Sequence, residues 1–81
     1  MNSQIDLAVK QLELLAVKFS RELSVIGAES CKTQTMNFLW FLCDGVKSLV
    51  VIHINDSIED INSEVKTAIQ STFNSYVSPN F

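Results

Sequence analysis

The sequence predicts an α+β fold in which two helices cover one face of a β-hairpin, in the order helix, strand, strand, helix. Three observations support it: a helical periodicity over about residues 3–26, two apolar runs around Asp44-Gly45, and a second helical periodicity over about residues 57–77. The length of 81 residues suits one small domain. We therefore expect a single αββα domain over residues 1–81, with its sheet completed by dimerisation and a tail at 78–81 without evident structure.

The first helix is expected over residues 3–26. Apolar residues recur there at helical spacing: Ile5, Ala8, Leu12, Leu15, Phe19 and Ile26. Ser3 suits the N-cap, and Gly27 follows the last periodic position as a stop signal. A helix of about 23 residues is roughly 35 Å long and would overhang a strand of about 23 Å. The apolar stripe is wider than a coiled-coil seam, which favours packing on a sheet.

The hairpin is expected over residues 35–54, after a polar connector. Asp44-Gly45 suits the positive φ angles of a type I′ turn, and a two-residue turn places Cys43 opposite Val46. One face then carries core-like residues: Asn37, Leu39, Phe41, Cys43, Val46, Ser48, Val50, Ile52 and Ile54. The other carries Met36, Phe38, Trp40, Leu42, Lys47, Leu49, Val51 and His53. An all-α alternative, with residues 34–50 helical, would place Gly45 unfavourably inside a helix.

The second helix is expected over residues 57–77. Asp56 or Ser57 can cap it, and Glu59 and Asp60 lie in its first turn, where acidic residues are favoured. Its apolar positions keep helical spacing: Ile58, Ile61, Val65, Ala68, Ile69, Phe73 and Tyr76. Pro79 then prevents the helix from continuing.

Two helices can cover only one face of the hairpin, so the other face is expected to meet a partner. The face rich in aromatic residues and methionine has the composition of a protein interface with a polar rim. The candidate interface residues are Met36, Phe38, Trp40, Leu42, Leu49 and Val51. We predict a homodimer, formed either by packing these faces or by joining hairpin edges into a four-stranded sheet.

The sequence offers no catalytic constellation. His53, Asp56 and Ser57 include the residue types of a hydrolase triad, but helix capping already explains the last two. Cys43 and His53 fall on opposite faces of the predicted hairpin, whereas Cys31 could approach His53 near its open end. We therefore expect no enzyme activity and no catalytic residue.

No cofactor or metal site is expected either. The soft ligands Cys31, Cys43 and His53 lack the spacing of a zinc site. The acidic residues Glu59, Asp60 and Glu64 are explained by their place near a helix N-terminus. The two glycines leave no glycine-rich phosphate loop.

Charge and composition narrow the class of partner. The formal net charge is −3 and no basic cluster occurs, which disfavours nucleic acid as the principal partner. The apolar run over residues 36–54 contains Asp44 and Lys47 near its centre, where a membrane helix does not tolerate charge. The first residues do not resemble a secretory signal, and two cysteines are too few for a disulfide scaffold. We expect a cytoplasmic protein with free thiols.

These observations predict a small acidic, non-enzymatic, homodimeric module that binds another protein as an adaptor, chaperone-like factor or inhibitor. One alternative is a ligand-binding or enzymatic dimer whose site at the subunit interface draws on Cys31, His53 and Tyr76. The other is a nucleic-acid-associated regulator, which requires four basic residues to gather on one side: Lys10, Lys18, Arg21 and Lys32.

Overall fold

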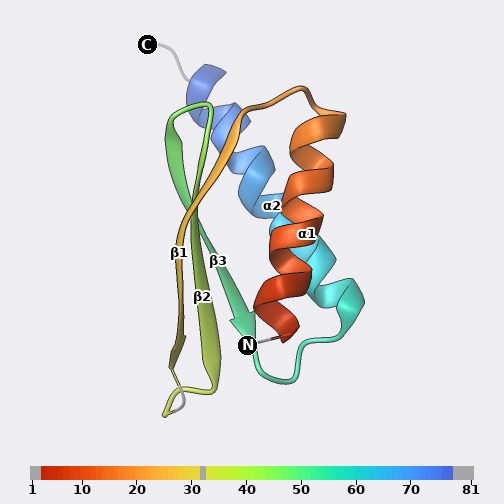
Figure 1. Cartoon of the computed structure of the whole chain (residues 1–81), viewed down its shortest axis with the longest axis vertical. Helices are drawn as coiled ribbons and strands as arrows, with labels where there is room; N and C mark the ends of the chain where they lie inside the picture. Colours follow the sequence, from red (N-terminus) through yellow and green to blue (C-terminus); the bar gives the residue numbers. More distant parts are fainter. Residues whose placement is uncertain (1–2, 32, 78–81) are drawn as a thin grey trace.

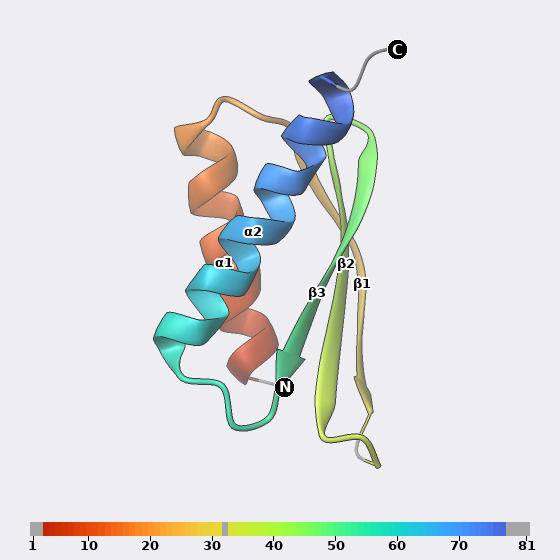
Figure 2. The ribbon, with the colours of Figure 1, turned by 180° about the vertical axis from the view of Figure 1, so that it is seen from behind.

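The chain folds into two layers, a three-stranded antiparallel sheet and a pair of helices on one of its faces (Figures 1 and 2). The computed structural model describes the backbone of residues 3–31 and 33–77 and the side chains of these ranges up to Phe73. The predicted tail at 78–81 lies outside the described residues. The elements are α1 (Ser3–Lys18), β1 (Leu23–Cys31), β2 (Met36–Cys43), β3 (Val46–His53) and α2 (Ile58–Val77). The α+β class and the packing of helices on a sheet are thus as predicted.

The predicted order of elements is wrong, because a third strand precedes the hairpin. The helix expected over residues 3–26 ends at Lys18, and Ser20 adopts a positive φ of 55° that breaks it. Residues 23–31 form β1 and pair with β2. Pairing satisfies backbone groups along an edge of β2 that a two-stranded hairpin would leave open, which outweighs the helical spacing of Leu23 and Ile26. At about 1.5 Å per residue, α1 is about 24 Å long and matches an eight-residue strand, so it does not overhang the sheet.

The hairpin register is confirmed. Cys43 pairs with Val46, and the register continues without a shift to Met36 opposite His53. Asp44 and Gly45 have φ angles of 51° and 83°, which define the expected type I′ turn.

Gly45→Ala is expected to lower the free energy of unfolding by about 1–2 kcal/mol, because an L side chain is strained at positive φ. A Cβ at position 45 would meet no atom within 4 Å, so the loss would come from the backbone alone. Gly27 is the matched control, since a Cβ there also meets nothing and its φ is outside the left-handed region. Urea denaturation should show little change for Gly27→Ala. Equal losses for the two variants would contradict this explanation.

The core lies between the sheet and the helices. α1 packs over β1 and β2, whereas α2 packs on β3 and against α1. The largest fully buried side chains come from the predicted core face and both helices: Phe41, Leu12, Leu39, Ile52, Ile61, Ile69, Val50 and Val65. Ile54, which was expected on this face, lies beyond the end of β3 and is 58% exposed. Apart from this residue and the half-buried Val46 and Ser48, the predicted core face is buried.

A polar cluster joins the α1–β1 loop to the hairpin turn. Asp44 accepts hydrogen bonds from the Glu22 backbone N–H at 2.8 Å and from the Arg21 guanidinium at 3.1 Å. The Asp44 N–H in turn donates to the Glu22 carbonyl at 2.8 Å. The Arg21 guanidinium also lies 4.3 Å from the centroid of the Phe73 ring on α2. Three segments that are distant in sequence are thereby fixed at one end of the sheet.

At the opposite end, the buried Asn37 side chain links the N-terminal turn of α1 to the sheet. Its Nδ2 donates to Gln4 Oε1 at 2.9 Å, and its Oδ1 accepts from the Ser30 hydroxyl at 2.8 Å. The Gln4 amide donates to the carbonyls of His53 and Ile54. These bonds explain how an amide is accommodated on the core face, since a buried polar group requires partners.

Candidate functional site

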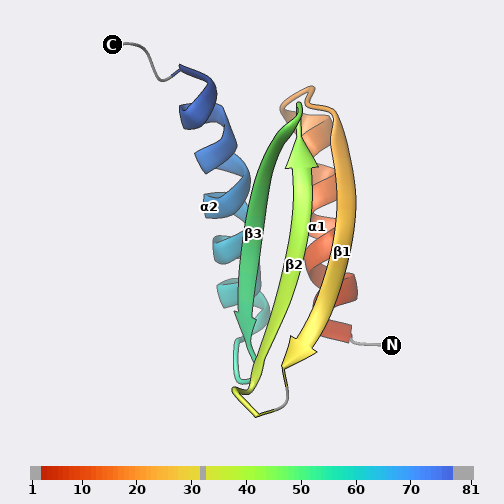
Figure 3. The ribbon, with the colours of Figure 1, turned by 90° about the vertical axis from the view of Figure 1, so that its left-hand side faces the viewer.

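The candidate site is the face of the sheet that points away from the helices, here called the uncovered face. Figure 3 shows this face in front, with both helices behind it. The predicted interface residues lie on it together: Met36, Phe38, Trp40 and Leu42 from β2, and Leu49 and Val51 from β3. All are partly exposed, with Leu49 at 39%. Their placement on one face is confirmed, whereas their role as an interface stays a prediction.

Two aromatic rings form the centre of the uncovered face. Phe38 and Trp40 are two positions apart on the central strand, and their ring centroids lie 5.9 Å apart at an interplanar angle of 30°. Gly27 of β1 lies opposite Trp40 and offers no side chain to cover the indole. The centre of the uncovered face therefore consists of two aromatic rings that are partly exposed to solvent.

β1, the strand that the sequence did not predict, contributes further residues to the uncovered face. Glu29 of β1 pairs with Phe38, and Cys31 pairs with Met36, so both share the face of their partners. With Lys47 and His53 on β3, Glu29 gives the aromatic centre a polar border. The missed signal is the alternation over residues 23–31, which a bulge between Val25 and Gly27 interrupts.

Cys31 and His53 occupy the same row of the sheet but do not form a dyad. Met36 pairs with both and lies between them, so their strands are about 10 Å apart. The Cys31 thiol instead contacts the Thr33 hydroxyl at 3.5 Å, and this bond together with the Gln34 backbone lowers its pKa. The Tyr76 side chain lies outside the described residues. Cys43 is buried on the opposite face, as expected.

Of the two remaining triad residues, Ser57 caps α2 as predicted, whereas Asp56 lies in the turn before the helix and does not cap it. The Ser57 hydroxyl accepts from the Asp60 N–H, and the Asp60 carboxylate accepts from the Ser57 N–H, both at 3.1 Å. This is a capping box at the start of α2. Asp56 accepts from the His53 backbone N–H at 2.9 Å and so closes the turn between β3 and α2.

Glu64 has an unusual environment that sequence reasoning missed. Burial raises its pKa to about 7, helped by a hydrogen bond with Asp56 and by the charges of Asp56 and Asp60. Its Oε1 atom is buried without a hydrogen-bond partner among the described residues. The hydrogen bond from Glu64, together with the His53 N–H, lowers the pKa of Asp56. Below about pH 7, Glu64 therefore holds a proton beside an ionised Asp56.

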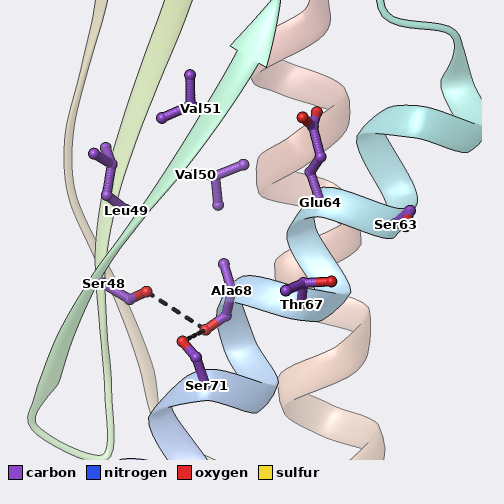
Figure 4. Close-up of a pocket in the computed structure, with 9 residues that line it drawn as sticks. All are labelled: Ser48, Leu49, Val50, Val51, Ser63, Glu64, Thr67, Ala68 and Ser71. Atoms are coloured by element: carbon purple, nitrogen blue, oxygen red, sulfur yellow. Dashed lines mark hydrogen bonds between the residues drawn. The ribbon is translucent and has the colours of Figure 1, made fainter.

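Glu64 lines a groove between the outer edge of β3 and α2 (Figure 4). The groove has a volume of about 410 Å³ and is lined mainly by small or hydroxyl-bearing side chains: Ser48, Leu49, Val50, Val51, Ser63, Glu64, Thr67, Ala68 and Ser71. The hydroxyls of Ser48 and Ser71 both donate to the Ala68 carbonyl. The periodicity of α2 predicted a packed helix but not this hollow beside the strand.

Several other site classes find no support in the part of the chain that is described. Over residues 3–31 and 33–77, no three His, Cys, Asp or Glu side chains converge as they would around a metal ion. Neither described helix combines the length and apolarity needed to span a membrane. Of the basic residues that a nucleic-acid site requires, Arg21 is engaged with Asp44 and Phe73, and Lys32 lies outside the described residues.

Comparisons with protein-family models, curated proteins and solved structures gave no match for this chain.

Proposed function

We propose that this chain is a non-enzymatic protein-binding module that dimerises through the uncovered face and acts on another protein as an adaptor, chaperone-like factor or inhibitor. The observation that carries the proposal is the partly exposed aromatic pair of Phe38 and Trp40, on a sheet whose two helices both pack on the other side. Contiguous exposed apolar patches bordered by polar residues commonly mark protein-binding sites.

The size of the face sets the expected strength of association. Three strands of about eight residues, spaced about 4.8 Å apart, present a face of roughly 14 by 26 Å. The area of such a face is roughly 360 Å², which is below the area of about 800 Å² that each partner buries in a standard interface. We therefore expect a homodimer with a micromolar dissociation constant rather than an obligate dimer.

The charges that border the face suit a second copy of the chain. Glu29 lies on β1 at one edge of the sheet, whereas Lys47 and His53 lie on β3 at the other edge. A two-fold axis along the strands would place β1 of one protomer over β3 of its partner. The acidic edge would then face the basic edge, and the aromatic centres would pack on each other.

Trp40→Glu tests the proposal, because it places a charge at the centre of the uncovered face. Sedimentation equilibrium over micromolar concentrations should show a dimer for the wild type and a folded monomer for Trp40→Glu. Leu14→Glu is the matched control, since Leu14 is 60% exposed on α1 in the other layer and the variant should still dimerise. A wild type that stays monomeric throughout this range would refute dimerisation.

A further inference from the structure

We propose that the outer edge of β3 binds a short extended segment of a partner protein as a fourth strand, with small side chains and one lysine or arginine directed toward α2. This inference rests on the proposed function only in that the chain binds another protein. It uses the edge of the sheet and not the uncovered face, so the two surfaces can be tested separately.

The edge of β3 offers unpaired backbone groups. A type I′ turn makes Cys43 and Val46 a hydrogen-bonded pair, so the N–H and C=O groups of Lys47, Leu49 and Val51 point away from β2. Among the described residues, no backbone hydrogen bond joins these outward groups to another element. His53 ends the free edge, because its N–H donates to Asp56 and its carbonyl accepts from the Asp56 N–H.

The other edge of the sheet is less suited to strand addition. β1 carries a bulge between Val25 and Gly27, with Ile26 52% exposed, and such irregularities protect an edge from pairing. β3 keeps a regular register along all of its eight residues. A regular, mainly apolar edge strand is a ready template for an added strand.

The position of α2 allows a single strand to pair with the edge of β3 but disfavours pairing with the β3 strand of a second copy of this chain. Figure 3 shows that α2 lies along and beyond the outer side of β3, rather than under the middle of the sheet. If two β3 strands paired at about 4.8 Å, their α2 helices would compete for the same space, since packed helix axes need about 8–10 Å. A segment without its own helix avoids this conflict.

The groove defines the side chains that such a segment would carry. Alternate residues of an added strand would point into the space lined by Ser63, Thr67 and Ala68, where small side chains fit (Figure 4). Glu64 brings a buried oxygen without a described partner, and Asp56 and Asp60 add negative charge beside it. A lysine or arginine from the segment would supply a charge-assisted hydrogen bond to Glu64 and would suit a chain with a net charge of −3.

The test uses synthetic peptides of about seven residues, the length that spans β3. Threonine occupies the odd positions, and the even positions carry one central lysine flanked by combinations of alanine, serine and threonine. Titration into the isotope-labelled full chain should shift the amide resonances of Lys47, Leu49 and Val51, and of Thr67 across the groove. Methylation of the peptide backbone nitrogens that face β3 should abolish these shifts, because it removes the strand hydrogen bonds.

Variants identify the role of each surface. At pH 8, where Glu64 is mainly ionised, Glu64→Gln should weaken binding of the lysine peptide about tenfold and should leave binding of a norleucine analogue unchanged. Leu49→Pro removes one outward N–H at a position that does not bond to β2 and should abolish binding by a folded chain. Trp40→Glu should bind the peptides as the wild type does, whether or not it dimerises.

Three results would overturn the proposal. The first is that no peptide of the panel shifts the β3 amides at millimolar concentration. The second is that N-methylated peptides bind as well as the parent peptides. The third is that wild-type chains pair with each other through β3. Such pairing would appear as concentration-dependent shifts of the amide resonances of Lys47, Leu49 and Val51 in the wild type, and these shifts would be absent from Leu49→Pro. None of these results bears on dimerisation through the uncovered face, which Trp40→Glu tests independently.

Discussion

Phe41→Ala is expected to lower the free energy of unfolding by about 3–5 kcal/mol, which is the range for removing a large buried ring. Phe41 lies on the central strand, is fully buried, and belongs to the core between the sheet and the helices. Domains of this size have a total stability near the low end of about 5–15 kcal/mol. Circular dichroism with urea should therefore show a variant that is largely unfolded without denaturant at physiological temperature.

Phe38→Ala is the matched control for this prediction. Phe38 lies on the same strand, but its side chain is on the uncovered face and is only partly buried. The same truncation should lower the free energy of unfolding of the monomer by about 1 kcal/mol, because the ring gives up little buried area. It should also weaken self-association if the uncovered face is the dimer interface. Similar losses for the two variants under monomeric conditions would contradict the assignment of the two faces.

The stability of the wild type is expected to fall by about 1–2 kcal/mol as the pH rises from about 5 to 8. The pKa of Glu64 is about 7 in the folded chain, against 4.5 as its ordinary value. Between these values the folded state binds more protons than the unfolded state, so each rise in pH favours unfolding. The stabilisation of the folded state by protonated Glu64 is complete below about pH 4.5 and is lost as the pH rises through about 7. The full pKa difference would give about 3 kcal/mol, and solvent near the partly exposed side chain reduces it.

Glu64→Gln should remove this dependence and make the chain more stable than the wild type at pH 8. The amide stays neutral and keeps a hydrogen-bond donor for Asp56, as a protonated Glu64 does. Glu13→Gln, an exposed substitution on α1, is the matched control and should keep the wild-type slope. The pKa of Asp56 is lowered, so Asp56 acts in the opposite direction and only in acid, as the pH falls toward its folded pKa. A wild-type stability that stays flat from pH 5 to 8 would show that Glu64 ionises normally.

The sequence by itself determined the features that depend on neighbouring residues. Asp44-Gly45 specified a type I′ turn, and this turn fixed the register and therefore the faces of Phe38, Trp40 and Phe41. The capping box of Ser57 and Asp60 and the apolar spacing that follows it placed α2 within one residue at its start. In each case the geometry is set within a few positions along the chain, so the residue types suffice.

Only the tertiary structure determined the secondary structure of residues 19–31 and the environment of Glu64. Leu23 and Ile26 have the spacing of a helix, but residues 23–31 form a strand because they pair with the edge of β2. The bulge at Ile26 interrupts the alternation of apolar and polar residues along this strand. In the sequence, Glu64 is an ordinary carboxylate near a helix N-terminus. In the folded chain it lies beside Asp56 and in the groove next to β3, and this environment raises its pKa. Strand pairing and burial depend on groups that are distant in sequence. Local periodicity therefore could not predict the third strand, the carboxyl pair or the groove beside β3.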